Sequence, residues 1–193
     1  NKINSKKVLD MCAAPGGKTI QLICKKAEVI SYDKNKNKLS TMKENLRRLN
    51  FNNEVINKDS LKINSKNKFD IVIIDAPCSS IGTIRRNPEI FYRHSSPNFQ
   101  YITSIQYKFL NKAKNLVKNK GIIIYMVCSF LNNEGNNQIE RFLNENKNFS
   151  LVKFFSKNRF INELINEKGF FKTYPINFRN KFLIDGFFAA QLQ

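Results

Sequence analysis

Residues 8–19 read VLDMCAAPGGKT, a short apolar run followed by small residues that lead into a helical pattern. A loop of this kind lets the backbone approach a ligand closely where a helix begins and its free amide groups point outward. The stretch therefore predicts a strand, a ligand-binding loop and a helix in succession. The loop has neither the Gly-x-Gly-x-x-Gly spacing of dinucleotide sites nor a Walker pattern, which argues against both ligand classes. A tight turn that binds nothing is the alternative.

Apolar runs alternate with helical patterns along the rest of the chain, which predicts a parallel sheet with crossover helices. Apolar residues recur at helical spacing over residues 39–49 and 102–116. Unbroken apolar runs at 71–74 and 122–124 predict strands that are covered on both faces. We therefore expect an α/β fold with a doubly wound, mostly parallel sheet and helices on both faces. The expected strands are residues 8–11, 29–32, 54–57, 69–74, 121–127 and 186–192.

The net charge of the chain is +18, from 33 Lys and Arg residues against 15 Asp and Glu residues. This charge points to polyanionic partners, nucleic acid first, although a genome biased toward Lys and Asn codons explains it equally well. No apolar run approaches the ~18 residues of a membrane span, so we expect a cytoplasmic protein with no membrane partner. The length suits one domain. Because the chain begins with Asn1 rather than Met, we expect a further region upstream.

Cysteine and histidine usage limits the chemistry that the chain can perform. The four cysteines, at positions 12, 24, 78 and 128, are too scattered for zinc ligands or a disulfide framework, so we expect reduced thiols. His94 is the single histidine, which leaves histidine-based metal sites and Ser-His-Asp hydrolysis without support. We expect no metal, and catalysis by other groups.

Polar side chains follow the predicted strands at the edge where α/β sheets bind their ligands. Asp33 ends the second strand, 23 residues after Asp10, where a carboxylate can accept both hydroxyls of a ribose. This spacing predicts a nucleoside-containing cofactor without saying which one, since nicotinamide dinucleotides use the same place. The other residues at these strand ends are Cys12, Asp59, Asp75 and Cys128.

Two of the cysteines directly follow strong strands. Cys78 lies in DAPCSS, residues 75–80, and Cys128 lies in VCS, residues 127–129. A free cysteine is usually a buried and inert small hydrophobe, and its thiol reacts only once it is ionised. Two thiols at neighbouring strand ends beside a cofactor loop favour a catalytic role instead.

Four motifs occur in order along the chain: residues 8–19, DAPCS at 75–79 with GTIRRNP at 82–88, Cys128-Ser129, and DGFF at 185–188. Together they resemble the Sun (Fmu) and Nop family of RNA cytosine-5 methyltransferases. Residues 82–88 are especially similar to the bacterial branch that modifies small-subunit ribosomal RNA. The resemblance implies a Rossmann-like class I methyltransferase catalytic domain over residues 1–193, without the N-terminal RNA-recognition region of that branch. It also implies S-adenosylmethionine as cofactor and ribosomal RNA as partner, with a monomer favoured.

The resemblance implies roles for individual residues. Cys128 would be the nucleophile, and Cys78 would assist product release. Asp75 would recognise the base, and Lys18 would be a further catalytic residue. Chemistry explains the thiols, because a thiolate added at carbon 6 of cytosine makes carbon 5 nucleophilic enough to take a methyl group. A carboxylate such as Asp75 suits the amino group of an unpaired or flipped cytosine, and a strand-end cap is its alternative role. The cofactor would contact Cys12, Ala13, Ala14, Pro15, Gly16, Gly17, Lys18, Asp33 (ribose), Asp59 (adenine) and Asp75.

Two departures from the family pattern leave alternatives open. Val127 stands where the family usually has Thr, and residues 133–135 read Asn-Glu-Gly where it usually has Glu-Glu-Asn. One alternative is an RNA-binding or ribosome-assembly protein with weak or no catalysis. Another is a methyltransferase in which Cys78 attacks, as in DNA cytosine methyltransferases. A nicotinamide oxidoreductase shares the fold but gives no reason for the two thiol motifs.

A basic stretch follows Cys78 along the chain. Its members are Arg85, Arg86, Arg93 and His94. Arginine-rich loops near a nucleic-acid site commonly contact phosphates, so we expect that role here, with a solvated basic loop as the alternative.

Overall fold

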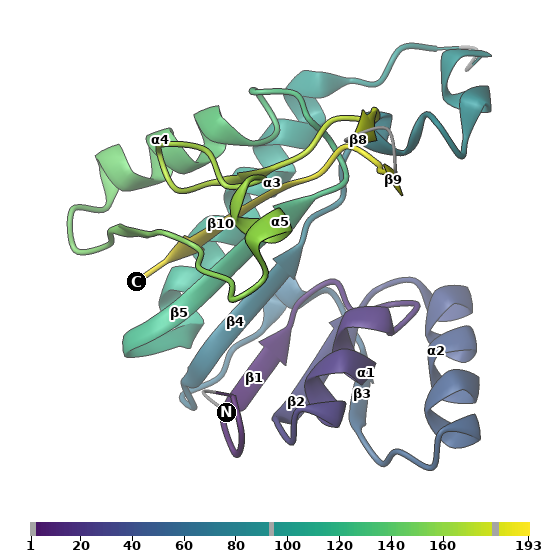
Figure 1. Cartoon of the computed structure of the whole chain (residues 1–193). Helices are drawn as coiled ribbons and strands as arrows, with labels where there is room; N and C mark the ends of the chain where they lie inside the picture. The colour runs from purple at the N-terminus through teal and green to yellow at the C-terminus, as the bar shows by residue number, and fades with distance from the viewer. Residues whose placement is uncertain (1–2, 93–94, 179–181) are drawn as a thin grey trace. The chain divides into compact units, whose positions relative to one another are not determined.

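The computed structural model describes residues 3–92, 95–178 and 182–193, of which residues 177, 178 and 182 are described by their backbone alone. The chain forms two compact units (Figure 1). The first unit comprises residues 1–75 and 112–123, and the second comprises residues 76–111 and 124–193. Helix α3 (Phe99–Leu116) and strand β5 (Val117–Val127) contribute residues to both units.

The first unit is built on parallel strands in the order β3-β2-β1-β4, with the start of β5 next to β4. Val8 lies opposite Val29 on one side and Ile71 on the other, which fixes the register of three strands. Figure 1 shows β1, β2 and β3 side by side with α1 and α2 next to them. The elements are β1 (Lys7–Asp10), α1 (Gly17–Cys24), β2 (Glu28–Asp33), α2 (Lys36–Arg48), β3 (Glu54–Asn57), the short 3₁₀ helix η1 (Ser60–Lys62) and β4 (Phe69–Asp75).

The core of the first unit comes from strands that are apolar on both faces. Leu9 and Val72 have no exposed surface, as expected for a covered parallel sheet. Helix α2 packs on the loop residue Ala13, and burial of its apolar stripe contributes about 25 cal/mol for each Å² removed from water. The stripe consists of Leu39, Met42 and Leu46.

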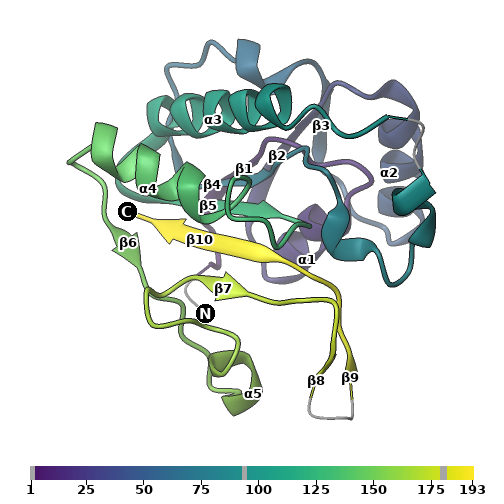
Figure 2. The ribbon, with the colours of Figure 1, turned by 90° about the horizontal axis from the view of Figure 1, so that it is seen from above.

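The second unit holds a small antiparallel arrangement in which β10 pairs with β6 and β7, and the end of β5 lies beside β10. In Figure 2, β10 runs between β5 and β7. The core of the second unit is aromatic: Tyr125, Phe170 and Phe188 are buried, and the Phe188 ring contacts the other two rings. Besides α3 and β5, the elements are the 3₁₀ helices η2 (Ile81–Thr83) and η3 (Pro88–Tyr92), α4 (Asn136–Glu145), β6 (Leu151–Val152), α5 (Arg159–Asn162), β7 (Phe171–Lys172), β8 (Asn177–Phe178), β9 (Phe182–Leu183) and β10 (Phe188–Leu192).

The predicted α/β class and mostly parallel sheet are confirmed. The strands expected at 29–32, 54–57 and 69–74 fall within β2, β3 and β4. Strand β5 starts at Val117, earlier than the expected residue 121. The next three residues, 118–120, are polar and exposed, so no apolar run marks the beginning of the strand in the sequence. Helix α4 is not predicted from the sequence, because its residues are mostly polar. It buries only Gln138, Ile139 and Phe142, which is too few for a clear apolar stripe. Among the described residues, no helix is both long and apolar enough to cross a membrane.

Candidate functional site

The loop after β1 is tied to the end of β2 by hydrogen bonds within the first unit. The Ala13 amide donates to the Tyr32 carbonyl at 3.0 Å, and the Ala14 amide donates to Asp33 Oδ2 at 3.1 Å. Asp33 Oδ1 accepts the Asn35 amide at 2.8 Å. The Asp33 carboxylate is therefore oriented by the loop, and it is half-buried with lone pairs left for further donors.

Two glycines shape the start of α1. Gly16 adopts a φ of 104°, and a Cβ there would come within 2.7 Å of Met42 Cγ, so both conformation and packing require glycine. A Cβ on Gly17 would meet no atom within 4 Å. The Gly17 backbone and the first amides of α1 therefore border open space that a ligand can approach closely.

A buried carboxylate, Asp10, lies behind this loop. Asp10 Oδ2 accepts a hydrogen bond from Thr19 Oγ1 at 2.7 Å, and Thr19 Oγ1 lies 3.1 Å from the Ser31 hydroxyl. Burial raises the pKa of Asp10 to about 6, although the Thr19 hydrogen bond acts in the opposite direction. The Cys12 amide also lowers the pKa of Asp10, to a smaller extent, so this buried carboxylate is held by groups of the loop and of α1.

Lys18 and Asp75 form an ion pair at the carboxyl edge of the first unit. Lys18 Nζ lies 2.6 Å from Asp75 Oδ2, and the two side chains are 38% and 36% exposed.

Burial, followed by the charges of Asp10, Asp33 and Asp75, raises the pKa of Cys12 well above its usual range. Cys12 therefore keeps its proton and can line a site only as a neutral group.

Asp59, another predicted cofactor residue of the first unit, lies just after β3. Its Oδ1 accepts the Leu61 amide at 3.0 Å and so caps the η1 helix. Asp59 follows β3, as Cys12 follows β1, whereas Asp33 and Asp75 are the last residues of β2 and β4. All four therefore lie at the carboxyl ends of the strands, where parallel sheets bind ligands.

A pocket of about 630 Å³ lies elsewhere in the first unit. It is lined at the opposite strand ends by Lys7, Glu28 and Phe69, each the first residue of its strand. Because parallel sheets usually bind their ligands at the carboxyl ends of the strands, we do not expect the cofactor in this pocket.

Cys78 and Cys128 face each other in the second unit. Their sulfur atoms lie 3.2 Å apart, and both residues are half-buried. Cys128 Sγ also lies 3.5 Å from the Ser80 hydroxyl. The hydrogen bond to Cys128 raises the pKa of Cys78, and burial adds to the effect. With its pKa raised, Cys78 keeps its proton, and its Sγ lies within hydrogen-bond distance of Cys128 Sγ.

Fully buried Glu134 holds the loop that carries Cys78. Glu134 Oε1 accepts the Ser79 amide at 2.8 Å, and Oε2 accepts the Ser79 hydroxyl at 2.5 Å. Gln106 Nε2 donates to Glu134 Oε1 at 3.1 Å and to the Pro77 carbonyl at 3.0 Å. Both neighbours of Cys78 are therefore fixed by one buried network, which satisfies a carboxylate that would otherwise be costly to bury.

Packing in the second unit accounts for two of the positions that depart from the family pattern, Val127 and Gly135. Val127 is completely buried, so an apolar side chain suits its position. A Cβ on Gly135 would lie 2.8 Å from the Phe188 ring, which leaves room for glycine alone. Glu134 lies between these positions in the sequence, and its carbonyl accepts the Tyr125 hydroxyl at 2.6 Å. The carboxylate network is therefore intact despite both changes.

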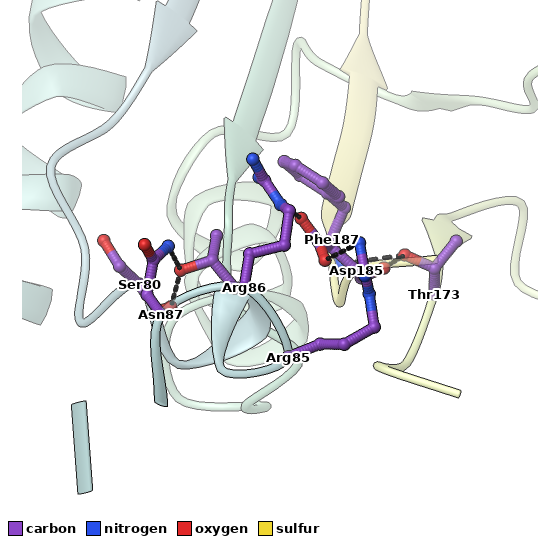
Figure 3. A network of polar contacts seen from close by, with 8 residues as sticks. Ser80, Arg85, Arg86, Asn87, Thr173, Asp185 and Phe187 are labelled. Carbon is purple, nitrogen blue, oxygen red and sulfur yellow. Dashed lines mark hydrogen bonds and ion pairs between the residues drawn. The ribbon is translucent and has the colours of Figure 1, made fainter. Parts of the chain in front are cut away.

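Two arginines of the basic stretch pair with an acid that lies far from them in the sequence. Arg85 and Arg86 share the carboxylate of Asp185, at 3.2 and 2.6 Å (Figure 3). The expectation for Arg93 and His94 lies outside the described residues.

Comparison with known proteins agrees with this geometry. The model of the family "16S rRNA methyltransferase RsmB/F" matches residues 1–193. The chain belongs to that family. Ribosomal RNA small subunit methyltransferase B of Photorhabdus laumondii subsp. laumondii is 34% identical over 155 residues, covering 78% of this chain and 36% of that protein. Its counterpart in Proteus mirabilis is 33% identical over 177 residues, covering 86% and 42%.

Two solved structures share the fold of this chain. The crystal structure of PH0851 has a TM-score of 0.86 at 30% identity, covering 98% of this chain and 43% of that one. NSun6 from Pyrococcus horikoshii, solved with SFG, has a TM-score of 0.79 at 28% identity, covering 97% and 47%. The Rossmann-like class I methyltransferase fold is thereby confirmed. The chain spans less than half the length of these relatives.

The structure brings several of the predicted site residues of this RsmB/F family chain together. Cys78 contacts Cys128, and Lys18 pairs with Asp75, while their catalytic roles stay predictions. The sequence alone does not assign a function to Glu134. Its position in the segment that corresponds to the family's Glu-Glu-Asn motif is the signal that points to it. Within the described ranges, no three His, Cys, Asp or Glu side chains cluster as metal ligands would.

Proposed function

We propose that this chain transfers a methyl group from S-adenosylmethionine to carbon 5 of a cytosine in small-subunit ribosomal RNA, in the cytoplasm. The pair of thiols 3.2 Å apart, Cys78 and Cys128, carries the proposal, because this reaction needs a thiolate that adds to the base and later leaves it. The names of the two ribosomal RNA methyltransferase relatives support RNA as the substrate. The net charge of +18 suits a polyanion.

The first unit offers groups that fit S-adenosylmethionine. Asp33 would accept the ribose hydroxyls, Asp59 would contact the adenine, and the first amides of α1 beside Gly17 would receive the carboxylate of the methionine part. The related NSun6 structure holds SFG, an analogue of this cofactor, which supports the assignment. When bound, the cofactor supplies an electrophilic methyl group.

Cys128 performs the addition in this proposal. Its thiolate attacks carbon 6 of cytosine, and the electron pair of the ring double bond moves to carbon 5, which takes the methyl group. The carbon-5 proton is then lost to a base, the double bond reforms, and the bond from carbon 6 to Cys128 Sγ breaks. Cys78 holds its proton at Sγ next to Cys128 and stabilises the thiolate both before attack and as it departs.

Asp75 recognises the base in this proposal. Its carboxylate would accept a hydrogen bond from the exocyclic amino group of cytosine, a group that uracil lacks. Lys18 Nζ, 2.6 Å from Asp75 Oδ2, keeps the Asp75 carboxylate oriented. The base must be unpaired or flipped out of its stack to reach these groups.

Transfer of labelled methyl groups to small-subunit ribosomal RNA tests the proposal. We expect Cys128→Ala to abolish incorporation, because no other group replaces the thiolate. Cys24→Ala serves as the matched control, since Cys24 is an exposed thiol at the end of α1. Full activity of the Cys128→Ala protein would refute the mechanism.

Denaturing gels separate the roles of the two thiols. We expect Cys78→Ala to accumulate a covalent adduct with RNA, and Cys128→Ala to form none. The reverse pattern would make Cys78 the nucleophile. A wild-type protein that binds RNA and cofactor without turnover would instead be a ribosome-assembly protein with a methyltransferase fold.

A further inference from the structure

A charged cluster in the second unit is not used by the methyl-transfer chemistry. It consists of Arg85, Arg86 and Asp185, and the Asp185 side chain is only 7% exposed. Arg86 Nε donates to Asp185 Oδ2 at 2.6 Å, while Arg85 Nη2 lies 3.2 Å from Asp185 Oδ1. Two guanidinium groups and one carboxylate leave a positive charge uncompensated at this point of the surface.

The main chain of Asp185, whose carboxylate pairs with both arginines, is held by Thr173. Thr173 Oγ1 donates to the Asp185 carbonyl at 2.7 Å and accepts the Phe187 amide at 2.8 Å (Figure 3). Thr173 is buried. The Asp185 main chain is therefore held in place, and from this fixed position its carboxylate pairs with the two arginines.

Main-chain hydrogen bonds connect this arginine loop to the nucleophile. The Gly82 amide donates to the Cys128 carbonyl at 3.0 Å, and the Gly82 carbonyl accepts the Gly186 amide at 2.7 Å. The Ser80 hydroxyl lies 3.5 Å from Cys128 Sγ, and the Ser80 carbonyl accepts Thr83 Oγ1 at 2.9 Å. Within the second unit, the arginines thus stand in a fixed relation to the Cys128 thiol.

Arg86 keeps donors for a further acceptor. Its side chain is 56% exposed, and its hydrogen bond to Asp185 uses Nε. In Figure 3 the outer end of the Arg86 guanidinium points away from Asp185. A guanidinium has five N–H donors in a planar fork that matches phosphate oxygens, so the remaining Nη groups are suited to an anion.

We propose that Arg85 and Arg86 bind a backbone phosphate of the RNA next to the nucleotide that Cys128 attacks, with Asp185 orienting both guanidinium groups. This inference rests on the proposed function, which makes RNA the polyanion. The phosphate contact positions the strand without reading its sequence, and the fixed link to Cys128 converts that contact into placement of the base.

Salt-dependent binding of a fluorescein-labelled single-stranded RNA of mixed sequence tests this site. For Arg85→Gln with Arg86→Gln, we expect affinity to fall about tenfold and the slope of log K against log salt to become shallower by about 0.7, as for one lost phosphate. The pair Arg85→Lys and Arg86→Lys should keep the slope, because the charges remain. A triple variant that adds Asp185→Asn avoids a buried unpaired carboxylate and should behave as the double Gln variant does.

The matched control is Lys157→Gln with Arg159→Gln, which removes the same charge from exposed positions of the second unit. We expect its slope to equal that of the wild type. If the double and triple Gln variants also keep the wild-type affinity and slope while the wild type methylates RNA, the phosphate site is wrong and the proposed function stands. If the wild type neither binds nor methylates RNA, the proposed function fails first.

Discussion

Glu134 accepts two hydrogen bonds from Ser79, one from its amide at 2.8 Å and one from its hydroxyl at 2.5 Å. The two residues are 55 positions apart in the sequence, so a buried carboxylate near the start of α4 sets the conformation of the loop that follows β4. Since Cys78 directly precedes Ser79, the same contact sets the direction in which the Cys78 thiol points. Glu134 is in this sense a positioning residue for the thiol pair.

Removal of the Glu134 carboxylate should loosen that thiol. We expect Glu134→Ala to lower the free energy of unfolding by roughly 3 kcal/mol, because buried donors of Ser79 and Gln106 lose their acceptor. Glu134→Gln should restore most of this stability, since it keeps one acceptor oxygen. Urea denaturation measures the loss, and the rate of methyl transfer should recover with the Gln variant. Glu140→Ala, on the exposed face of α4 beside Lys168, should change neither quantity.

Loss of the Asp33 carboxylate should weaken cofactor binding. We expect Asp33→Ala to lower the affinity for S-adenosylhomocysteine about 10- to 100-fold, the effect of losing hydrogen bonds to a charged group. Isothermal titration calorimetry measures it. Asp70→Ala is the control, because Asp70 pairs with Lys118 at the opposite end of the sheet. Equal affinity of the Asp33→Ala and wild-type proteins would remove Asp33 from the site.

Two glycine substitutions should have opposite consequences. A Cβ on Gly82 would lie 1.9 Å from the Gly186 carbonyl oxygen, so Gly82→Ala should destabilise the fold by about 3 kcal/mol or more. Gly17→Ala meets no neighbour and should fold at least as well as the wild type, yet bind S-adenosylhomocysteine less tightly. Thermal melting with and without that ligand distinguishes the two. A Gly17→Ala protein stabilised by ligand as strongly as the wild type would contradict the placement of the cofactor.

The buried Asp10 should make stability depend on pH. Its pKa is about 6 when folded and near 3.8 when unfolded, so between these values the folded state binds more protons and stability falls as pH rises. Asp10→Asn lacks this penalty. Relative to the wild type, the variant should therefore gain up to about 3 kcal/mol of unfolding free energy between pH 4 and pH 7, and little beyond. Denaturation at both pH values measures the difference, and a difference that does not change with pH would show that Asp10 is ionised without cost.

The site could be predicted from the sequence wherever a residue lies next to a strong strand. The sequence predicts Asp33, Asp75 and Cys128 as site residues because each follows a clear apolar strand and ligands bind where such strands end, and the structure places all three at strand ends. Glu134 was not found, because its role depends on Ser79 and Gln106, which no local pattern connects to it. The pairing of Arg86 with Asp185 escaped prediction for the same reason, since 99 positions separate them.

The fold was predicted best where local periodicity and burial agree. The parallel strands of the first unit are apolar on both faces, and their continuous runs reveal them. The second unit relies on short strands such as β6 and β7, of two residues each, that exist only through pairing with β10. Their sequence carries too little alternation to predict a strand, and tertiary pairing supplies what propensity does not.

The contact between Gly135 and Phe188 ties the start of α4 to β10. A Cβ at position 135 would lie 2.8 Å from the Phe188 ring, and that ring also contacts the rings of Tyr125 and Phe170. A smaller residue at 188 alone would leave a cavity in the core. The energetic effects of substitutions at the two positions should therefore not add, because a smaller side chain at 188 makes room for a side chain at 135.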